Sequence, residues 1–392
     1  MVRIPDVLFF QEGPGVRNTQ YTSSGVKLLN VANLQNGEID LTTSERYISD
    51  EEANGRYKHF LVDEGDFIIA SSGIKVDYFE KKMGFIKREH LPLCMNTSTI
   101  RFKVLDKDQL CLRYFMYYLK TNSFKKQLGQ LITGSAQLNF GPSHLEKINI
   151  PFPPIETQKQ IAKTLETAAE LLTMRKQQLA ELDNLIKSTF YDMFGDPVAN
   201  EKGWDMKAIG DFSIVKIGPF GSLLHVEDYI EGGFPLVNPS HIVGSKIVPD
   251  IRLTLSTEKY NELKSYNMKK NDIIVGRRGE IGRCAIVEDE GLLCGTGSMF
   301  IRIESDYLPI MLQRIISSDT IRAKLEYQSV GVTMKNLNSG TISNLEVPMI
   351  PIHLQTQFAT IVTKIEEQKS LVKKAIDETQ YLFDSLMSEY VE

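Results

Sequence analysis

The chain has 392 residues, 42% hydrophobic and 24% charged, with a formal net charge of −5. This is the composition of an ordinary globular protein of two or three domains. No apolar run approaches the roughly 18 residues of a membrane span, and the first residues lack the apolar core of a signal peptide, so we expect a cytoplasmic protein. The charge balance disfavours a generic nucleic-acid coat, although local basic faces remain open.

The first half opens with short apolar runs separated by turns. The run at 66–70 (DFIIA) predicts a buried strand that ends in a glycine-containing turn. The segment 113–119 predicts a short helix, and a second polar turn follows at 133–139. Glycine lets the backbone approach a partner closely, so both turns are candidate binding elements. Their candidate side chains are Ser71, Ser72, Lys75, Gln137 and Asn139.

The densest basic run of the chain follows the first turn. It consists of Lys81, Lys82, Lys87 and Arg88. Such a run can contact phosphates, and the alternative is a solvated surface.

A proline-rich hinge at 151–154 then precedes a long heptad pattern. Proline suits the first turn of a helix and marks a sharp helix start. Steps of 4 and 3 from Ile161 to Met193 give ten positions, of which eight are apolar. A 3.5-residue period sustained over this length favours a coiled coil. The helix is expected to end at Gly195, and its candidate seam residues are Leu165, Leu172, Leu179 and Ile186.

The second half repeats these parts in the same order. The segment 148–161 (INIPFPPIETQKQI) returns 197 positions later as 345–358 (LEVPMIPIHLQTQF). A predicted strand at 272–275 leads into the turn 277–283 (RRGEIGR), a short helix is expected at 310–316, and a turn ends at Asn336. The candidate binding residues are Arg277, Arg278, Arg283, Lys335 and Asn336.

A second heptad pattern runs from Phe358 to Tyr390, again with eight apolar positions of ten. Its candidate seam residues are Val362, Val372, Ile376 and Phe383. The two helices can pair antiparallel and place the halves about a pseudo-twofold axis, with helix length acting as a ruler. The alternative is that each helix packs only on its own domain.

These elements predict an α/β (α+β) fold with an internal repeat. We expect a first globular domain at 1–152, a long helix at 153–196, a second globular domain at 197–350 and a second long helix at 351–392. Two domains that recognise different sequences require similar turns that carry different side chains. Arginine can bind guanine in a bidentate manner, and asparagine or glutamine can bind adenine.

Searches for catalytic and metal-binding motifs mostly fail. No phosphate-binding loop or zinc-protease motif is present, and the four cysteines are scattered without a CxxC pair, which indicates reduced buried thiols. One fragment, Asp250 with Glu262 and Lys264, matches the loose pattern of metal-dependent nucleases. Its alternative interpretation is a surface turn and a solvated helix, and we expect no catalytic or metal-binding residue in this chain.

The chain resembles the specificity subunits of type I restriction–modification systems. The resemblance is carried by 145–161 (LEKINIPFPPIETQKQI), the helix end at 193–197 (MFGDP), the restart at 203–204 (GW) and 209–211 (IGD). It implies two target-recognition domains, each reading one half of a split DNA site, and an antiparallel coiled coil that sets the spacer. The first half departs from the pattern because it lacks the Gly-Trp lead-in.

The resemblance also implies that the chain is not an enzyme and binds no cofactor itself. It would dock two methyltransferase subunits that use S-adenosylmethionine, and restriction/translocase subunits that use ATP and magnesium, on double-stranded DNA. Two alternatives remain at this stage. One is the nuclease, and the other is a protein-only coiled-coil scaffold that never contacts DNA.

Overall fold

The computed structural model describes residues 1–74, 76–132, 138–329 and 336–391. The chain forms two compact units, unit 1 (Met1–Lys176 with Lys374–Glu392) and unit 2 (Gln177–Lys373). The boundaries between them fall inside the long helices α6 (Ile155–Phe194) and α11 (Ile352–Tyr390). Each unit therefore combines one globular part with a portion of both helices.

The globular part of unit 1 is built on a four-stranded antiparallel sheet of order β2-β11-β7-β9. Along β7, Phe67 and Ile69 belong to the cluster beneath the helices, whereas Ile68 and Ala70 belong to a cluster on the other face. This alternation is the two-residue period of a strand buried on both faces. The four strands are β2 (Leu8–Glu12), β7 (Phe67–Ala70), β9 (Met83–Phe85) and β11 (Thr99–Val104).

A second, three-stranded sheet of order β10-β3-β6 pairs β10 with β3 in parallel. Short antiparallel pairs complete the unit: β1 with β13, β4 with β5, and β8 with β12. The remaining strands are β1 (Val2–Arg3), β3 (Val26–Leu29), β4 (Leu34–Gln35), β5 (Glu38–Ile39), β6 (Tyr47–Ile48), β8 (Ser72–Ile74), β10 (Leu93–Met95), β12 (Leu138–Asn139) and β13 (Asn149–Ile150). The helices are α1 (Ile4–Val7), α2 (Asp50–Asn54), α3 (Leu112–Tyr118), α4 (Asn122–Leu131) and α5 (Pro142–Leu145), with short 3-10 turns that include η2 (Val31–Asn33), η5 (Val76–Lys81) and η6 (Arg88–His90).

Unit 2 repeats the same plan. Its four-stranded antiparallel sheet has the order β15-β24-β21-β22, and a second sheet pairs β17 with β23 in parallel. The strands are β14 (Met206–Ala208), β15 (Ser213–Ile217), β16 (Tyr229–Ile230), β17 (Phe234–Val237), β18 (Ile242–Val243), β19 (Lys246–Ile247), β20 (Thr254–Leu255), β21 (Ile273–Gly276), β22 (Cys284–Ile286), β23 (Leu293–Cys294), β24 (Ser298–Ile303) and β25 (Glu346–Pro348). The helices are α7 (Thr257–Glu262), α8 (Pro309–Ser317), α9 (Asp319–Gln328) and α10 (Ser339–Ser343), with 3-10 turns that include η10 (Pro239–His241).

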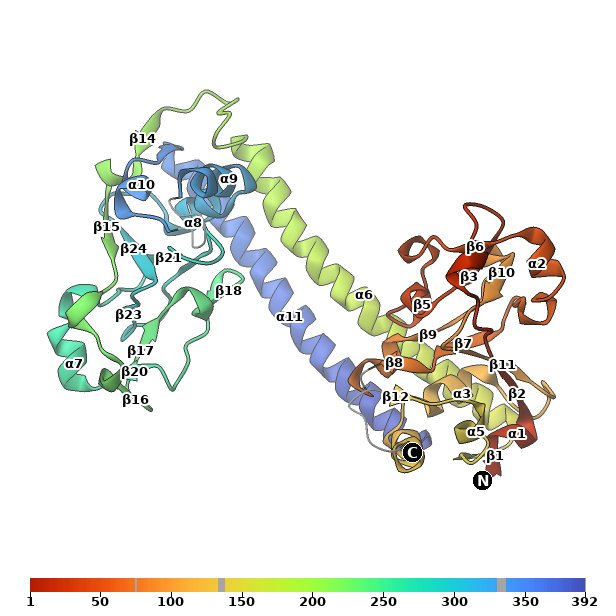
Figure 1. Cartoon of the computed structure of the whole chain (residues 1–392). Helices are drawn as coiled ribbons and strands as arrows, with labels where there is room; N and C mark the ends of the chain where they lie inside the picture. The colour runs from red at the N-terminus through yellow and green to blue at the C-terminus, as the bar shows by residue number, and fades with distance from the viewer. Residues whose placement is uncertain (75, 133–137, 330–335, 392) are drawn as a thin grey trace. The chain divides into compact units, whose positions relative to one another are not determined.

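The long helices close the core of each unit. In unit 1, Leu165 of α6 and Val391 at the end of α11 lie in one buried cluster with α3 and the central sheet. In unit 2, Phe190 of α6 and Phe358 of α11 pack edge to face with ring centroids 5.7 Å apart. Within each unit, opposite ends of the two helices therefore lie together, which is antiparallel pairing (Figure 1).

The architecture expected from the sequence is confirmed: two mixed helix-and-sheet halves and two long helices. The predicted strands correspond to β7 and β21, and the predicted short helices to α3 and α8. All eight candidate seam residues lie at buried or half-buried positions. In the first half β1 pairs with β13, as β14 pairs with β25 in the second half. None of the described helices combines the length and apolarity needed to cross a membrane.

A buried glutamine at the start of each long helix fastens it to its globular part. The Oε1 of Gln158 accepts from Cys111 N–H at 2.9 Å, and its Nε2 donates to the carbonyls of Gln109 and Pro153 at 2.9 and 2.8 Å. The Oε1 of Gln355 accepts from Leu308 N–H at 2.7 Å in the same manner. The amide satisfies backbone groups that the core would otherwise leave unpaired.

We predict that Gln158→Leu destabilises the chain by about 3 kcal/mol, because it leaves several buried backbone groups without partners. Calorimetry should show a lower midpoint of thermal unfolding. The exposed Gln160, two positions further along α6, supplies the control, and Gln160→Leu should change stability by less than about 0.5 kcal/mol. Equal shifts for the two variants would show that the buried hydrogen bonds contribute nothing.

Candidate DNA-binding interface

In unit 1 the two polar turns predicted from the sequence lie side by side. Strand β8 pairs with β12, which sets Ser72 opposite Asn139. The Oδ1 of Asn139 accepts from Ser72 Oγ at 2.6 Å and from Gly73 N–H at 3.1 Å. The backbone N–H of Phe140 donates to the Ser71 carbonyl at 2.9 Å. Residues 66 positions or more apart in the chain therefore form one structural element.

Unit 2 builds the same element with arginines in place of the two serines and with an asparagine in the same place. Arg278 forms an isolated antiparallel bridge with Asn336. The N–H of Leu337 donates to the Arg277 carbonyl at 3.0 Å, which is the counterpart of the bond from Phe140 to Ser71 in unit 1. The Nε of Arg277 donates back to the Leu337 carbonyl at 2.8 Å. We call the two elements the paired turns; they comprise Ser71–Gly73 with Asn139 and Arg277–Gly279 with Asn336.

The side chains of the paired turns differ in accessibility. Asn139 and Arg278 are exposed, whereas Ser71 is fully buried and its hydroxyl donates to Glu12 at 3.3 Å. Arg277 is half-buried, and burial together with the neighbouring Arg278 lowers the pKa of its guanidinium. Asn139 and Arg278 thus carry the exposed side chains of the paired turns. Ser71 holds its turn, and its sequence-based assignment to DNA contact is wrong, because its side chain does not reach the surface.

Lys82 and Arg283 occupy equivalent places and make equivalent internal contacts. Lys82 Nζ donates to the Val31 carbonyl at 3.5 Å, and an Arg283 amino group donates to the Pro239 carbonyl at 3.3 Å. Both acceptors are the first residues of 3-10 turns, η2 and η10. Arg283 is also ion-paired with Glu280. These two cations therefore support the fold of their domains, and their charge is only partly available to a ligand.

The basic run of the first half is divided by a strand. Lys81 and Lys82 precede β9, and Lys87 and Arg88 follow it. The rise of an extended chain separates the two pairs by about 16 Å. The first pair lies at the paired-turn end of the sheet, since Ala70 N–H bonds to the Lys82 carbonyl. The basic run that the sequence offers as a phosphate contact therefore forms two separate basic positions. Three further candidates, Lys75, Gln137 and Lys335, lie outside the described residues.

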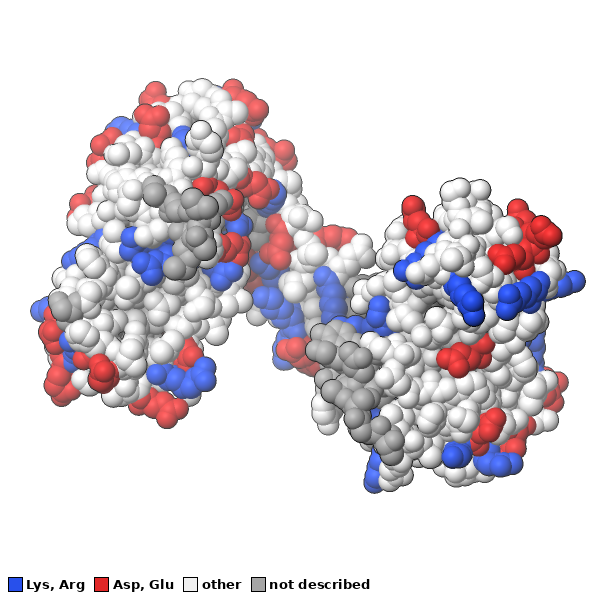
Figure 2. Space-filling model, viewed as in Figure 1, with Lys and Arg blue, Asp and Glu red and all other residues white. Residues whose placement is uncertain are grey.

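The charge distribution agrees with the near-neutral composition. On the face shown in Figure 2, basic and acidic side chains are interspersed over both globular parts. This face can offer a phosphate backbone discrete contacts from a few exposed cations, rather than one broad basic surface.

The residues of the nuclease alternative do not form a metal site. Asp250 accepts hydrogen bonds from Arg252, which lower the pKa of its carboxyl to about 2. Glu262 lies at the end of α7 and pairs with Lys259 at 3.1 Å. Lys264 is exposed beside it. Among the residues that the structure describes, no group of three or more His, Cys, Asp or Glu side chains could hold a metal ion.

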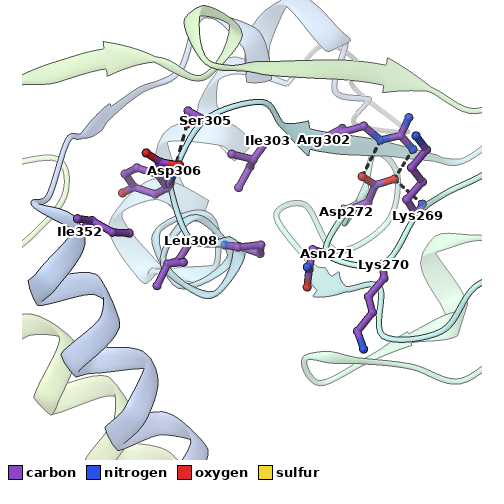
Figure 3. Close-up of a pocket in the computed structure, with 12 residues that line it drawn as sticks. Lys269, Lys270, Asn271, Asp272, Arg302, Ile303, Ser305, Asp306, Leu308 and Ile352 are labelled. Carbon is purple, nitrogen blue, oxygen red and sulfur yellow. Dashed lines mark hydrogen bonds and ion pairs between the residues drawn. The ribbon is translucent and has the colours of Figure 1, made fainter.

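A cleft of about 450 Å³ opens in unit 2 at the other end of β21 from the paired turns. Figure 3 shows Asp272 between Arg302 and the start of the loop at Lys269. Asp272 accepts from Arg302 at 2.6 Å and from the Lys269 N–H at 2.7 Å. In unit 1, Asp66 and Lys103 form the corresponding ion pair at 3.5 Å. Because this contact recurs in both units and is internally satisfied, it serves the fold rather than a ligand.

Sequence reasoning missed one cation near the paired turns. Arg322 of α9 binds Glu280 at 2.5 Å, so Glu280 holds both Arg283 and Arg322. Arg322 is 42 positions from Glu280 in the chain. No local pattern connects the two, and only the packing of α9 against the 280–283 turn brings them together.

Comparison with known proteins now identifies the family. The family model for the type I restriction modification DNA specificity domain matches twice, over residues 18–184 and 201–380. The chain belongs to this family. The two matches correspond to the two repeats recognised in the sequence.

Individual relatives are distant but extend along most of the chain. The type I restriction enzyme MjaIX specificity subunit of Methanocaldococcus jannaschii is 23% identical, with 96% of this chain and 88% of that protein covered. The EcoKI specificity subunit of Escherichia coli K12 is 22% identical, covering 89% and 77%. A type I S subunit structure from M. genitalium aligns with a TM-score of 0.56 at 18% identity, covering 100% of this chain and 95% of that one. This structural likeness supports the fold.

We predict that Arg278→Ala weakens binding to non-specific duplex DNA and lowers the slope of log affinity against log salt by about 0.9, the release expected for one phosphate contact. Binding titrations between about 50 and 200 mM salt measure both effects. Arg252→Ala is the charge-matched control, because Arg252 is held by Asp250. Equal changes for both variants would mean that only net charge matters.

Proposed function

We propose that this chain is the DNA-recognition subunit of a type I restriction–modification complex, with one target-recognition domain for each half of a split, asymmetric site. The observation that most directly supports this proposal is the presence of a paired turn in each unit. The hydrogen bond between its two segments recurs in both units, while the position held by Ser72 in unit 1 is held by the exposed Arg278 in unit 2. Equivalent positions with different donors and acceptors favour different bases.

Helix length supports recognition of two separated half-sites. Half-sites one turn of DNA apart are centred roughly 34 Å from each other. Helix α6 has 40 residues and α11 has 39, and at about 1.5 Å per residue each measures roughly 60 Å. Both helices run through both units. A pair of helices of this length can therefore set the DNA spacer between the half-sites that the two target-recognition domains bind.

The chemistry would belong to partner subunits. We propose two methyltransferase subunits that use S-adenosylmethionine, and restriction/translocase subunits that use ATP and magnesium, while this chain contributes recognition and no catalytic group. The long helices also expose large apolar side chains, among them Met174 on α6 and Leu371 and Tyr381 on α11. Exposed apolar side chains of this kind suit protein partners.

Mapping of methylated adenines tests the proposal directly. DNA modified by this chain together with its methyltransferase partner should carry methyl groups at one bipartite sequence with a fixed spacer. Arg278→Ala should relax only the half read by unit 2, and Asn139→Ala only the half read by unit 1. If the chain bound the methyltransferase but no DNA, the protein-only scaffold would replace this proposal. Cleavage of plasmid by the chain and magnesium alone would favour the nuclease.

The length of the helices should determine the spacer. Insertion of one heptad into both α6 and α11 preserves the seam phase and lengthens each helix by about 10 Å. At about 3.4 Å per base pair, the methylated site should gain about three base pairs of spacer and keep both half-site sequences. Altered half-site bases with an unchanged spacer would contradict a role of the helices in spacing.

A further inference from the structure

The seams of the two long helices contain four polar residues. The heptad steps define ten seam positions in each helix, and the polar ones are Arg175, Thr189, Lys369 and Thr379. Three of these make polar contacts with the opposite helix in their own unit. Polar groups in a seam lower stability, but they can specify which helix is the partner and in which register it pairs. The contacts of these residues therefore indicate which pairing they favour.

In unit 1, Arg175 of α6 reaches across to α11. Its guanidinium donates to the Ala375 carbonyl and to the hydroxyl of Thr379. Thr379 is buried, and its own hydroxyl donates to the Ala375 carbonyl at 2.8 Å. One of the two acceptors on α11 is therefore the Thr379 side chain, and the other is a backbone carbonyl.

In unit 2, the contact runs in the other direction and has different chemistry. Lys369 of α11 is buried, and its Nζ lies 2.6 Å from Asp183 of α6 and 2.8 Å from Glu366. Burial would lower the pKa of this ammonium, but the hydrogen bonds to the two carboxylates raise it above its usual value. Arg314 of α8 also lies 3.7 Å from Glu366, so the charges facing Lys369 are held by the globular part as well.

The repeat does not reproduce these contacts. At the offset of 197 residues, Arg175 corresponds to Val372 and Thr379 to Leu182, while Lys369 corresponds to Leu172 and Asp183 to Gln380. In an equivalent pair of two α6 helices from different copies, Arg175 would therefore meet Leu182, and Asp183 would meet Leu172. In a pair of two α11 helices, Lys369 would meet Gln380 and Thr379 would meet Val372.

We propose that the polar pairs Arg175–Thr379 and Lys369–Asp183 restrict α6 to pairing with α11 in a single register and exclude pairing of like helices between copies. A like pair or a shifted register separates Arg175 from Thr379 and Lys369 from Asp183, which leaves cations in the seam with fewer partners and is unfavourable, whereas a fully apolar seam tolerates several alternatives. The inference concerns folding and pairing. Only its consequence for the DNA spacer rests on the proposed function.

The test is an apolar-seam variant of the full chain, in which Arg175→Leu, Asp183→Leu, Lys369→Leu and Thr379→Leu are combined. Its thermal midpoint should equal or exceed that of the wild type, because Lys369 and Thr379 are buried, and replacement of buried polar groups together with their partners by apolar residues is often neutral or stabilising. Light scattering after size exclusion should show new self-association. Spin labels at the exposed Thr173 and Glu378 of unit 1 should give one distance in the wild type and several in the variant.

A composition-matched control keeps the polar pairs. It combines Lys163→Leu, Glu181→Leu, Thr356→Leu and Lys364→Leu, all at exposed positions of the same helices. The control should keep the single spin-label distance and the wild-type mass. A single distance and an unchanged mass in the apolar-seam variant would overturn the proposal, as would equal self-association in the control.

Neither readout involves DNA, so failure here is distinguishable from failure of the proposed function. If methylation mapping yields a bipartite site, the apolar-seam variant should in addition modify sites with altered spacers at least tenfold more often than the wild type. Retention of the single spacer by that variant would overturn the link between register and spacing.

Discussion

Each globular part shares its hydrophobic core with both long helices, and the rest of the structure depends on this constraint. In unit 1 the core includes Leu165 near the start of α6 and Val391 at the end of α11. In unit 2 it includes Phe190 near the end of α6 and Phe358 near the start of α11. Burial of large apolar side chains is the main favourable term in folding. The helices are therefore part of both domains rather than a linker between them.

The duplication preserved contacts that hold this frame. Gln158 and Gln355 fasten helix starts to globular parts, and Asp66 and Asp272 bind cations on the neighbouring strand. At one outward position of the paired turns the repeats diverged, with Ser72 in unit 1 and Arg278 in unit 2. The seam diverged too, since Arg175 and Lys369 have apolar counterparts in the repeat. Pairing of two different helices, like recognition of two different half-sites, requires the repeats to be unequal.

The sequence predicted the features that depend on periodicity. The heptad pattern, the proline hinges and the apolar runs placed α6, α11, β7 and β21 closely, because each follows from local chemistry. It could not predict which turn residues face outward. Ser71 and Ser72 are neighbours of the same type, yet only the packing of β2 against the turn buries Ser71 against Glu12. The internal contacts of Lys82 and the pairing of Arg322 with Glu280 also depend on distant segments.

A main-chain hydrogen bond joins the two segments of each paired turn: Phe140 N–H to the Ser71 carbonyl, and Leu337 N–H to the Arg277 carbonyl. Side chains add further bonds, from Ser72 and Gly73 to Asn139 and from Arg277 to Leu337. A backbone hydrogen bond is indifferent to the identity of the adjacent side chains. Codons for an exposed position outside these contacts, such as Arg278, can therefore change at little cost in folding free energy, since surface substitutions usually alter stability by less than about 0.5 kcal/mol. In this architecture a lineage can explore new recognition sequences by single mutations while its folded population stays constant.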